Sequence, residues 1–160
     1  MTNTNYKTIA SKIKFEGRAF IGGKYVDAID GDKFETINPA TGEVLCSVAK
    51  CNSKDVDLAV KVSRKAFNNG IWSRTSPEFR KDILLKFAEL LRKHGVENSV
   101  LESVDTGKLI GDCINEVAND APMHFQWYGE LIDKVFGKIG STDPSTTSLI
   151  VKEPIGVVAG

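Results

Sequence analysis

Two histidines and three cysteines are the side chains that could carry nucleophilic or acid–base chemistry in this sequence. A cysteine beside a histidine would supply a nucleophile and the base that activates it. His94, however, falls in the last turn of a predicted helix, where a cationic side chain is expected for capping reasons. His124 lies among aromatic residues, which favours a packed or surface imidazole over a catalytic one. We therefore assign neither histidine a catalytic role.

The cysteines form no pattern that indicates a disulfide framework or a zinc site, because their number is odd and no paired C-x-x-C occurs. They are Cys46, Cys51 and Cys113. Cys46 falls on an alternating strand, and a free cysteine behaves as a small hydrophobic residue unless its thiolate is stabilised. Only Cys113 has a helix N-terminus in its favour, and burial is the simpler interpretation. The spacing fits a reducing compartment and names no reaction by itself.

The composition excludes two classes of partner. The 160 residues carry 21 basic and 21 acidic side chains, so no positive field is available to hold nucleic acid or an acidic membrane. No apolar run approaches the roughly 18 residues that a membrane helix needs. A phosphate cradle is disfavoured as well, because neither G-x-G-x-x-G nor G-x-x-x-x-G-K-[ST] occurs. We expect a globular protein that binds no nucleic acid and no membrane.

The elements that must position any site begin with two predicted β-hairpins. Short β-prone runs flank Gly22–Gly23, whose glycines can adopt positive φ in a tight turn. Two further runs flank a turn from Asn38 to Gly42. The preceding residues, 1–17, form a tail for which we expect either disorder or docking to the body. A transit peptide is the alternative, and the absence of arginine before Arg18 argues against it.

Three helices follow the hairpins. Ser53 is the predicted N-cap of the first, and Gly70 ends it. Ser76 is the predicted N-cap of the second, which has proline at its first position and an apolar stripe that is most simply core. The third helix is predicted from about Val96 to Val104.

A fourth helical segment and a third hairpin complete the pattern. Apolar residues recur at helical spacing between Asp112 and Phe136. Pro122 must break or restart that helix, because proline lacks an amide donor and crowds the preceding turn. Two strands are predicted at Gly137–Asp143 and Leu149–Val151, joined by a turn.

The last stretch, Ile155–Ala159, is a continuous run of small and β-branched apolar residues. Such a run without polar alternation is typical of a strand buried on both faces, as in a parallel sheet covered by helices. A strand of that kind needs partners on both sides and a crossover helix after it. Because the sequence supplies neither, we expect the 160 residues to be an amino-terminal piece of a larger α/β protein.

Five segments resemble motifs of the aldehyde dehydrogenase superfamily, in that family's order and spacing. They are Phe20–Asp27, Thr36–Glu43, Asp55–Val60, Leu101–Lys108 and Val151–Ala159. The last is similar to the stretch that enters the family's coenzyme domain. Trp127–Tyr128 and Ile132–Val135 further resemble the subgroup that acts on gamma-glutamyl-gamma-aminobutyraldehyde and related amino-aldehydes. The resemblance covers the chain from about Phe20 to Gly160.

The resemblance implies NAD(P)-dependent oxidation of an aldehyde, and in that subgroup of an amino-aldehyde, to a carboxylic acid. In this family a cysteine thiolate attacks the carbonyl, an asparagine and a backbone amide stabilise the oxyanion, hydride passes to the nicotinamide, and a glutamate activates water. The motifs that hold these three side chains, and the positions that contact the coenzyme, lie beyond Gly160. We therefore assign no catalytic and no cofactor-binding residue. We expect this chain alone to be inactive and to bind neither NAD nor NADP.

The implied fold class is α/β, as the incomplete N-terminal part of an aldehyde dehydrogenase-like fold. Residues 1–17 are the tail, and residues 18–136 form the leading hairpins and the helical flank of the NAD-binding domain. Residues 137–152 supply a β-hairpin arm for oligomerisation, and residues 153–160 begin the parallel sheet of the coenzyme domain. We expect a homo-oligomer that forms through the arm, in the cytoplasm in preference to the mitochondrial matrix.

One site of the family falls within these residues. Many relatives hold a structural monovalent cation through the carbonyl oxygens at the positions of Thr36 and Ile37 and the carboxylate at the position of Asp105. A strand end and a helix-capping aspartate are the alternative interpretation of the same residues, and the sequence leaves both open.

A function from a different class is also open, that of a non-catalytic, truncated module that docks to intact subunits. Such a module would use the strands of its arm to extend a sheet of its partner. Under either hypothesis the elements present apolar faces to polypeptide outside the chain. We therefore expect the isolated chain to be marginally stable and prone to association.

Overall fold

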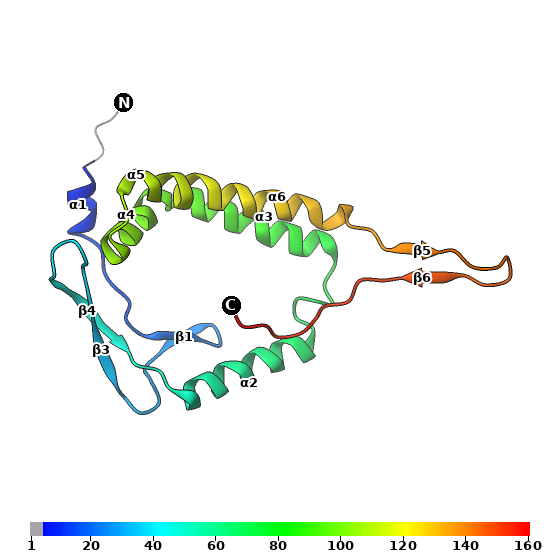
Figure 1. Cartoon of the computed structure of the whole chain (residues 1–160), viewed down its shortest axis with the longest axis horizontal. Coiled ribbons are helices and arrows are strands. Elements are labelled where there is room, and N and C mark those ends of the chain that lie inside the picture. The colour runs from blue at the N-terminus through cyan, green and yellow to red at the C-terminus, as the bar shows by residue number, and fades with distance from the viewer. Residues whose placement is uncertain (1–4) are drawn as a thin grey trace.

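The computed structural model describes residues 5–160 (Figure 1). The chain begins with α1 (Tyr6–Ala10) and two antiparallel hairpins, β1–β2 (Ala19–Ile21, Lys24–Val26) and β3–β4 (Lys33–Ile37, Val44–Ala49). Three helices follow, α2 (Ser53–Asn69), α3 (Pro77–Lys93) and α4 (Gly95–Thr106). The helical part ends with α5 (Ile110–Cys113), the π-helix η1 (Ile114–Asp120), α6 (Ala121–Leu131) and the 3₁₀ turn η2 (Ile132–Lys134). The third hairpin, β5–β6 (Lys138–Gly140, Ser148–Ile150), extends from the body as an arm (Figure 1).

The predicted tail contains a short docked helix. Residues 1–4 of that tail lie outside the described part of the chain. α1 packs against α4, and its Tyr6 and Ala10 line a shallow apolar pocket with Val100 and Val104. Asn5 caps α1, because its side chain accepts a hydrogen bond from the Thr8 amide at 3.1 Å.

The start of α2 differs from the prediction by one residue. Its N-cap is Asn52, and Ser53 is the first helical residue, so the assignment of Ser53 as the cap was wrong. The physical reason is a reciprocal capping box. The Asn52 side chain accepts a hydrogen bond from the Lys54 amide, while the Asp55 carboxylate accepts one from the Asn52 amide, both at 2.9 Å. The predicted end is confirmed, since Gly70 closes α2 with a φ of 67°.

The Asp55 carboxylate also connects α2 to the loop after β2. Its second oxygen accepts a hydrogen bond from the Ile29 amide at 2.9 Å, and the residue is buried. Hydrogen bonds from the Asn52 and Ile29 amides stabilise the ionised form, so the pKa of Asp55 lies below its ordinary value. One carboxylate therefore holds both the first turn of α2 and the chain that leads from the first hairpin.

Helices α3 and α6 lie side by side and form the main helical layer (Figure 1). The predicted start of α3 is confirmed, because the Ser76 hydroxyl accepts a hydrogen bond from the Phe79 amide at 3.2 Å. Close approach of the two helices depends on Gly129 of α6, where an added Cβ would lie 3.1 Å from the Leu84 Cβ of α3. The rings of Phe87 and Phe125 meet edge to face, with their centroids 4.7 Å apart.

Pro122 follows a change of helix type. The predicted restart takes the form of a π-helix, η1, after which α-helical hydrogen bonding resumes in α6 with Pro122 in its first turn. A π-helix has a wider pattern of backbone hydrogen bonds than an α-helix. The helical segment can therefore continue through Pro122 although proline has no amide hydrogen to donate. In this arrangement Ala118 of η1 lies against Gly95 of α4, where an added Cβ would be 2.9 Å from the Ala118 Cα.

Ile155–Ala159 does not form the predicted strand. The described sheets are three separate antiparallel hairpins, and residues 151–160 pair with none of them. Ile155 is 94% exposed, and its burial was predicted only within a sheet whose other strands lie outside these residues. A strand exists only when a neighbour accepts its backbone hydrogen bonds, and no neighbouring strand lies beside this stretch in the described structure.

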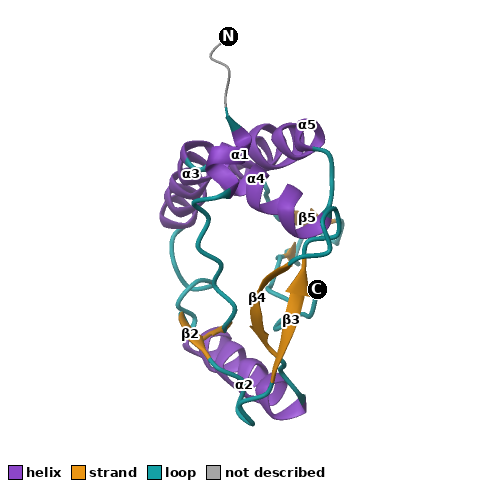
Figure 2. Cartoon of the chain, turned by 90° about the vertical axis from the view of Figure 1, so that its left-hand side faces the viewer, coloured by secondary structure: helices purple, strands orange, loops and turns teal. Residues whose placement is uncertain are grey.

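The chain exposes far more surface than a compact protein of its size. It presents 12163 Å², whereas a compact monomer of 17.5 kDa presents about 7,900 Å². Among the described residues, the buried apolar side chains are small or medium-sized: Ala28, Ala49, Ala88, Val100 and Cys113. Figure 2 shows why, since α2 and the first hairpin stand apart from the helical layer. In the described part of the chain, no helix combines the length and the apolar character that crossing a membrane requires.

Candidate cation site at the second hairpin

The candidate site begins at an irregularity in the β3–β4 hairpin. Thr36 pairs with Cys46, but the next residue, Ile37, pairs with Val44, so the register shifts between them. One residue of β4, Leu45, is therefore extra. Such a bulge interrupts the ladder of backbone hydrogen bonds and redirects side chains. Thr36 and Ile37 thus lie where the regular hydrogen-bonded pairing of the hairpin is interrupted.

The other half of the site is the C-terminal end of α4. Gly107 ends this helix with a φ of 76°, and an added Cβ there would lie 2.8 Å from the ring of Pro39 in the β3–β4 turn. The Ser103 hydroxyl donates a hydrogen bond to the Lys108 carbonyl at 2.7 Å, which fixes the chain as it leaves the helix. Close packing of Gly107 on Pro39 therefore brings the last turn of α4 against the hairpin.

Thr36 and Asp105 meet across this contact. The Thr36 hydroxyl donates to the Asp105 carboxylate at 3.4 Å, longer than the usual 2.5–3.0 Å for a hydroxyl donor. They lie in a cavity of about 550 Å³ that the N-terminal segment also lines, through Lys14 and Glu16. The group combines the Asp105 carboxylate with the Thr36 hydroxyl, and such oxygen atoms are the type of ligand that hard cations take. The residues present therefore fit a small hard cation.

The structure brings two of the predicted site residues, Thr36 and Asp105, into contact although they are far apart in sequence. Ile37 follows Thr36 on β3 and is exposed. The hydrogen bond described for the Asp105 side chain goes to Thr36, and the end of α4 is closed by Gly107. The cation site therefore stays a prediction, and so does the alternative of a strand end beside a helix-capping aspartate.

The cysteines and histidines belong to different elements of the fold. Cys113 is fully buried, and burial raises the pKa of its thiol, so it is a packed hydrophobic residue and not a nucleophile. Cys46 is half-buried on β4, and Cys51 is exposed. His94 ends α3, and the Nδ1 atom of His124 lies 2.9 Å from the Asp120 carbonyl within its own helix. No group of three or more histidine, cysteine or acidic residues that could hold a metal occurs among residues 5–160.

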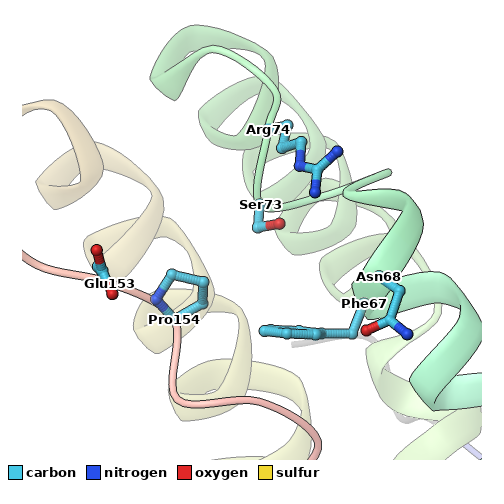
Figure 3. Close-up of a pocket in the computed structure, with 6 residues that line it drawn as sticks. All are labelled: Phe67, Asn68, Ser73, Arg74, Glu153 and Pro154. Carbon is cyan, nitrogen blue, oxygen red and sulfur yellow. The ribbon is translucent and has the colours of Figure 1, made fainter.

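A second hollow of about 610 Å³ lies between the end of α2 and the C-terminal stretch (Figure 3). It is lined by Phe67, Asn68, Ser73, Arg74, Glu153 and Pro154. The Phe67 ring points toward Pro154 (Figure 3). The lining contains neither cysteine nor histidine. This hollow marks where the C-terminal stretch passes α2.

Comparison with known proteins assigns the class. Residues 25–160 match the aldehyde dehydrogenase family, so the chain belongs to that family. It is 40% identical over 158 residues to aminoacetaldehyde dehydrogenase of Pseudomonas aeruginosa, an alignment that covers 99% of this chain and 32% of that protein. It is 39% identical over 150 residues to the NADP/NAD-dependent aldehyde dehydrogenase PuuC of Escherichia coli, covering 94% of this chain and 30% of the relative.

Solved structures agree with the sequence comparison. Gamma-glutamyl-gamma-aminobutyraldehyde dehydrogenase from Burkholderia cenocepacia J2315 matches with a TM-score of 0.91 at 40% identity, over 94% of this chain and 31% of that one. A mutant of the indole-3-acetaldehyde dehydrogenase AldA of P. syringae, solved with NAD+, matches with a TM-score of 0.90 at 37% identity, over 94% and 30%. The predicted fold, the N-terminal part of an aldehyde dehydrogenase fold, is confirmed. The chain spans about 30% of the length of these relatives.

Sequence reasoning missed the buried carboxylate of Asp55 and the capping role of Asn52. The signal was available as the spacing Asn52-x-x-Asp55, which is a capping-box pattern. It missed the contact of Gly95 with Ala118 and that of Gly107 with Pro39 as well. No local pattern reports those contacts, because each joins elements that are distant in sequence.

Proposed function

We propose that this chain is the N-terminal portion of an NAD(P)-dependent aldehyde dehydrogenase that oxidises an amino-aldehyde to a carboxylic acid. The observation that supports it most is the continuous similarity, over nearly the whole chain, to relatives named for amino-aldehydes in both sequence and structure. When bound, NAD(P)+ accepts the hydride of the aldehyde. A relative solved with NAD+ supports that choice of coenzyme.

In this proposal the chain positions the reacting parts and does not itself react. The buried thiol of Cys113 supports this view, because burial raises its pKa and a nucleophilic cysteine needs an accessible thiolate. The cysteine, asparagine and glutamate that carry the family's chemistry would come from other residues of the fold. The chain alone is then inactive and binds neither NAD nor NADP.

The cation site is part of the same proposal. The carbonyl oxygens of Thr36 and Ile37 and the carboxylate of Asp105 would bind a monovalent cation, which would hold the β3–β4 hairpin against α4. The bulge at Thr36 and the approach of its hydroxyl to Asp105 support this assignment. Its role is structural, since it is built from elements that carry no reacting group.

The proposal divides the chain into functional regions. Residues 1–17 form a tail, 18–136 flank the NAD-binding domain, 137–152 form the oligomerisation arm, and 153–160 lead into the parallel sheet. The arm supports a homo-oligomer, because Ile139 and Leu149 face each other across its strands while remaining 78% and 65% exposed. A lone two-stranded hairpin is only marginally stable in water, so these side chains need a partner. Three free cysteines support a cytoplasmic location.

A second candidate function is a non-catalytic module that docks to intact subunits through the arm. The exposed edges of β5 and β6 favour it, because unpaired strand edges can extend a partner's sheet. Tagged chain that captured intact subunits, and lost them when arm residues were changed, would support this alternative.

The main proposal is tested with a chimera. Residues 1–160 are fused to the part of P. aeruginosa aminoacetaldehyde dehydrogenase that follows the matched segment. We expect the chimera to form NADH from aminoacetaldehyde, and the 160-residue chain alone to form none. An insoluble or inactive chimera would contradict the proposal, and so would turnover by the chain alone. A neutral aldehyde of the same size serves as the control for amino-aldehyde preference.

A further inference from the structure

The segment that precedes the first hairpin is attached at both of its ends. At its start, α1 lies beside α4, with Tyr6 and Ala10 in a shallow apolar pocket of that helix (Figure 1). At its other end, the Gly17 carbonyl accepts a hydrogen bond from the Ala49 amide of β4 at 2.7 Å. We call residues 5–18, which contain both attachments, the strap.

The attachment to β4 requires a glycine. An added Cβ at Gly17 would lie 2.1 Å from the Ser47 carbonyl oxygen, a distance that a side chain reaches only if the backbone shifts. The Arg18 guanidinium donates hydrogen bonds to the Glu16 carboxylate at 2.8 and 2.7 Å, and it lies over the Tyr25 ring, 5.6 Å from the centroid. This end of the strap is therefore held against both hairpins.

The attachment to α4 is weak by comparison. α1 has five residues, and none of them is buried. A helix of that length is not stable by itself in water, so α1 forms only while it is docked. The start of the strap can therefore detach and dock again while its other end stays in place.

Between its two attachments the strap forms one wall of the cavity at the candidate cation site. Half-buried and exposed residues alternate along this part of the strap, as in an extended segment, and Phe15 is half-buried. Phe15 lines the same cavity of about 550 Å³ as Thr36 and Asp105. Cys46 lines that cavity as well, and it pairs with Thr36 across the β3–β4 hairpin. The reactivity of the Cys46 thiol therefore reports access to this cavity.

We propose that the strap is a gate on this cavity, which opens when α1 leaves α4 and takes Phe15 out of the cavity wall. The monovalent cation as the occupant rests on the proposed function. The gate itself rests on the contacts of α1, Phe15 and Gly17 within this chain. The rate at which Cys46 reacts with a small reagent then follows the fraction of molecules in which α1 is undocked.

The experiment measures thiol reactivity in the 160-residue chain. The chain is treated with iodoacetamide, and mass spectrometry of tryptic peptides follows each cysteine, because cleavage after Lys50 separates Cys46 from Cys51. The exposed Cys51 is the internal reference, and the fully buried Cys113 reports unfolding of the chain. We expect Cys46 to react more slowly than Cys51 in the parent chain.

Two variants open the gate in different ways. Ala10→Asp places a charge in the contact between α1 and α4, and it should raise the rate at Cys46 at least about tenfold, because an unpaired charge is costly to bury. Phe15→Ala leaves both attachments in place and removes the ring from the cavity wall, so it should raise that rate as well. Thr8→Asp is the matched control, because it adds the same charge to α1 at an exposed residue outside the pocket. It should change the rate by less than about twofold.

A change of cation tests the occupant separately. Potassium should lower the rate at Cys46 in the parent chain relative to a large organic cation of equal ionic strength. A rate that rises in Ala10→Asp and is the same in both cations leaves the gate standing and overturns the cation assignment. An inactive chimera likewise overturns the proposed activity and leaves the gate standing, because thiol reactivity requires no turnover.

Two results would overturn the gate. One is a rate at Cys46 that is the same in the parent chain, in Ala10→Asp and in Phe15→Ala. The other is an equal rise at Cys46 and Cys113, which would show that the variants unfold the chain and do not open one cavity.

Discussion

Hydrogen bonds to two side-chain carboxylates join the first two hairpin regions of this chain to helices. The Asp55 carboxylate and the Thr36–Asp105 pair each join a hairpin to a helix, and neither depends on a large apolar core. These contacts matter more here than in a compact domain, because the described core holds few large side chains. Two predictions belong to this scale.

The first concerns the cation. If Thr36, Ile37 and Asp105 hold one, potassium or sodium should raise the melting temperature of the chain above that in a large organic cation of equal ionic strength. Asp105→Asn should abolish that difference, because it removes the one full negative charge of the set. Asp112→Asn is the control on the neighbouring helix. Thermal scans monitored by circular dichroism measure the effect, and equal scans in all cations would contradict it.

The second concerns pH. Because the folded-state pKa of Asp55 is lowered, its contribution to stability is complete above the ordinary unfolded value of about 3.9 and is lost as pH falls through the folded value. Asp55→Asn should lower the urea concentration that halves the ellipticity at pH 7, and should remove part of the further decline as the pH falls below about 4. Asn52→Ala, which removes the cap, should cost about 1 kcal/mol. Asp57→Asn should behave like the parent chain.

At the scale of elements, close helix packing is controlled by glycines. Gly95 allows α4 to cross η1, since an added Cβ would lie 2.8 Å from the Ala118 Cβ and 2.9 Å from its Cα. The backbone of η1 cannot move as a side chain can. This contact holds the first residue of α4, the helix that carries Asp105, against η1.

Gly95→Ala should therefore destabilise the chain by about 1–3 kcal/mol, the usual cost of overpacking. Gly111→Ala is the matched control, because nothing lies within 4 Å of its added Cβ and helix propensity alone should make that change neutral or favourable by up to about 1 kcal/mol. Urea titration followed at 222 nm compares the two. A Gly95→Ala chain as stable as the control would show that the contact is not tight.

Local signals predicted most element boundaries, and contact-dependent features escaped them. Ser76 and Gly70 were correctly predicted as helix boundaries, because helix capping depends on residues that are close in sequence. The π-helix was not predicted as such, since Pro122 indicates only an interruption and not the type of helix that precedes it. Thr36 and Asp105 came from family resemblance, as their proximity depends on Gly107 packing against Pro39.

At the scale of the molecule, the chain exposes a large surface area and buries few large side chains. The exposed area is 12163 Å², and the arm is exposed as well. Both indicate apolar faces that pack against polypeptide other than the hairpins and helices described above. Ile155–Ala159 shows the consequence most directly. Its sequence is that of an interior strand, and it has no strand to pair with in the described structure.

We expect the isolated chain to self-associate at micromolar concentration and to unfold in urea over a broad range. Sedimentation velocity at increasing concentration should show growing average mass, and Ile139→Lys in the arm should reduce that growth. A monomer that unfolds in one steep transition would contradict this prediction.

The bond between Asp55 and the Ile29 amide also bears on the order of events at the ribosome. Both partners, and the Asn52 cap, are translated before α3. These hydrogen bonds can therefore form while most of the chain is still being made. The first hairpin and the start of α2 would then be in contact with each other before the later segments of the fold are synthesised.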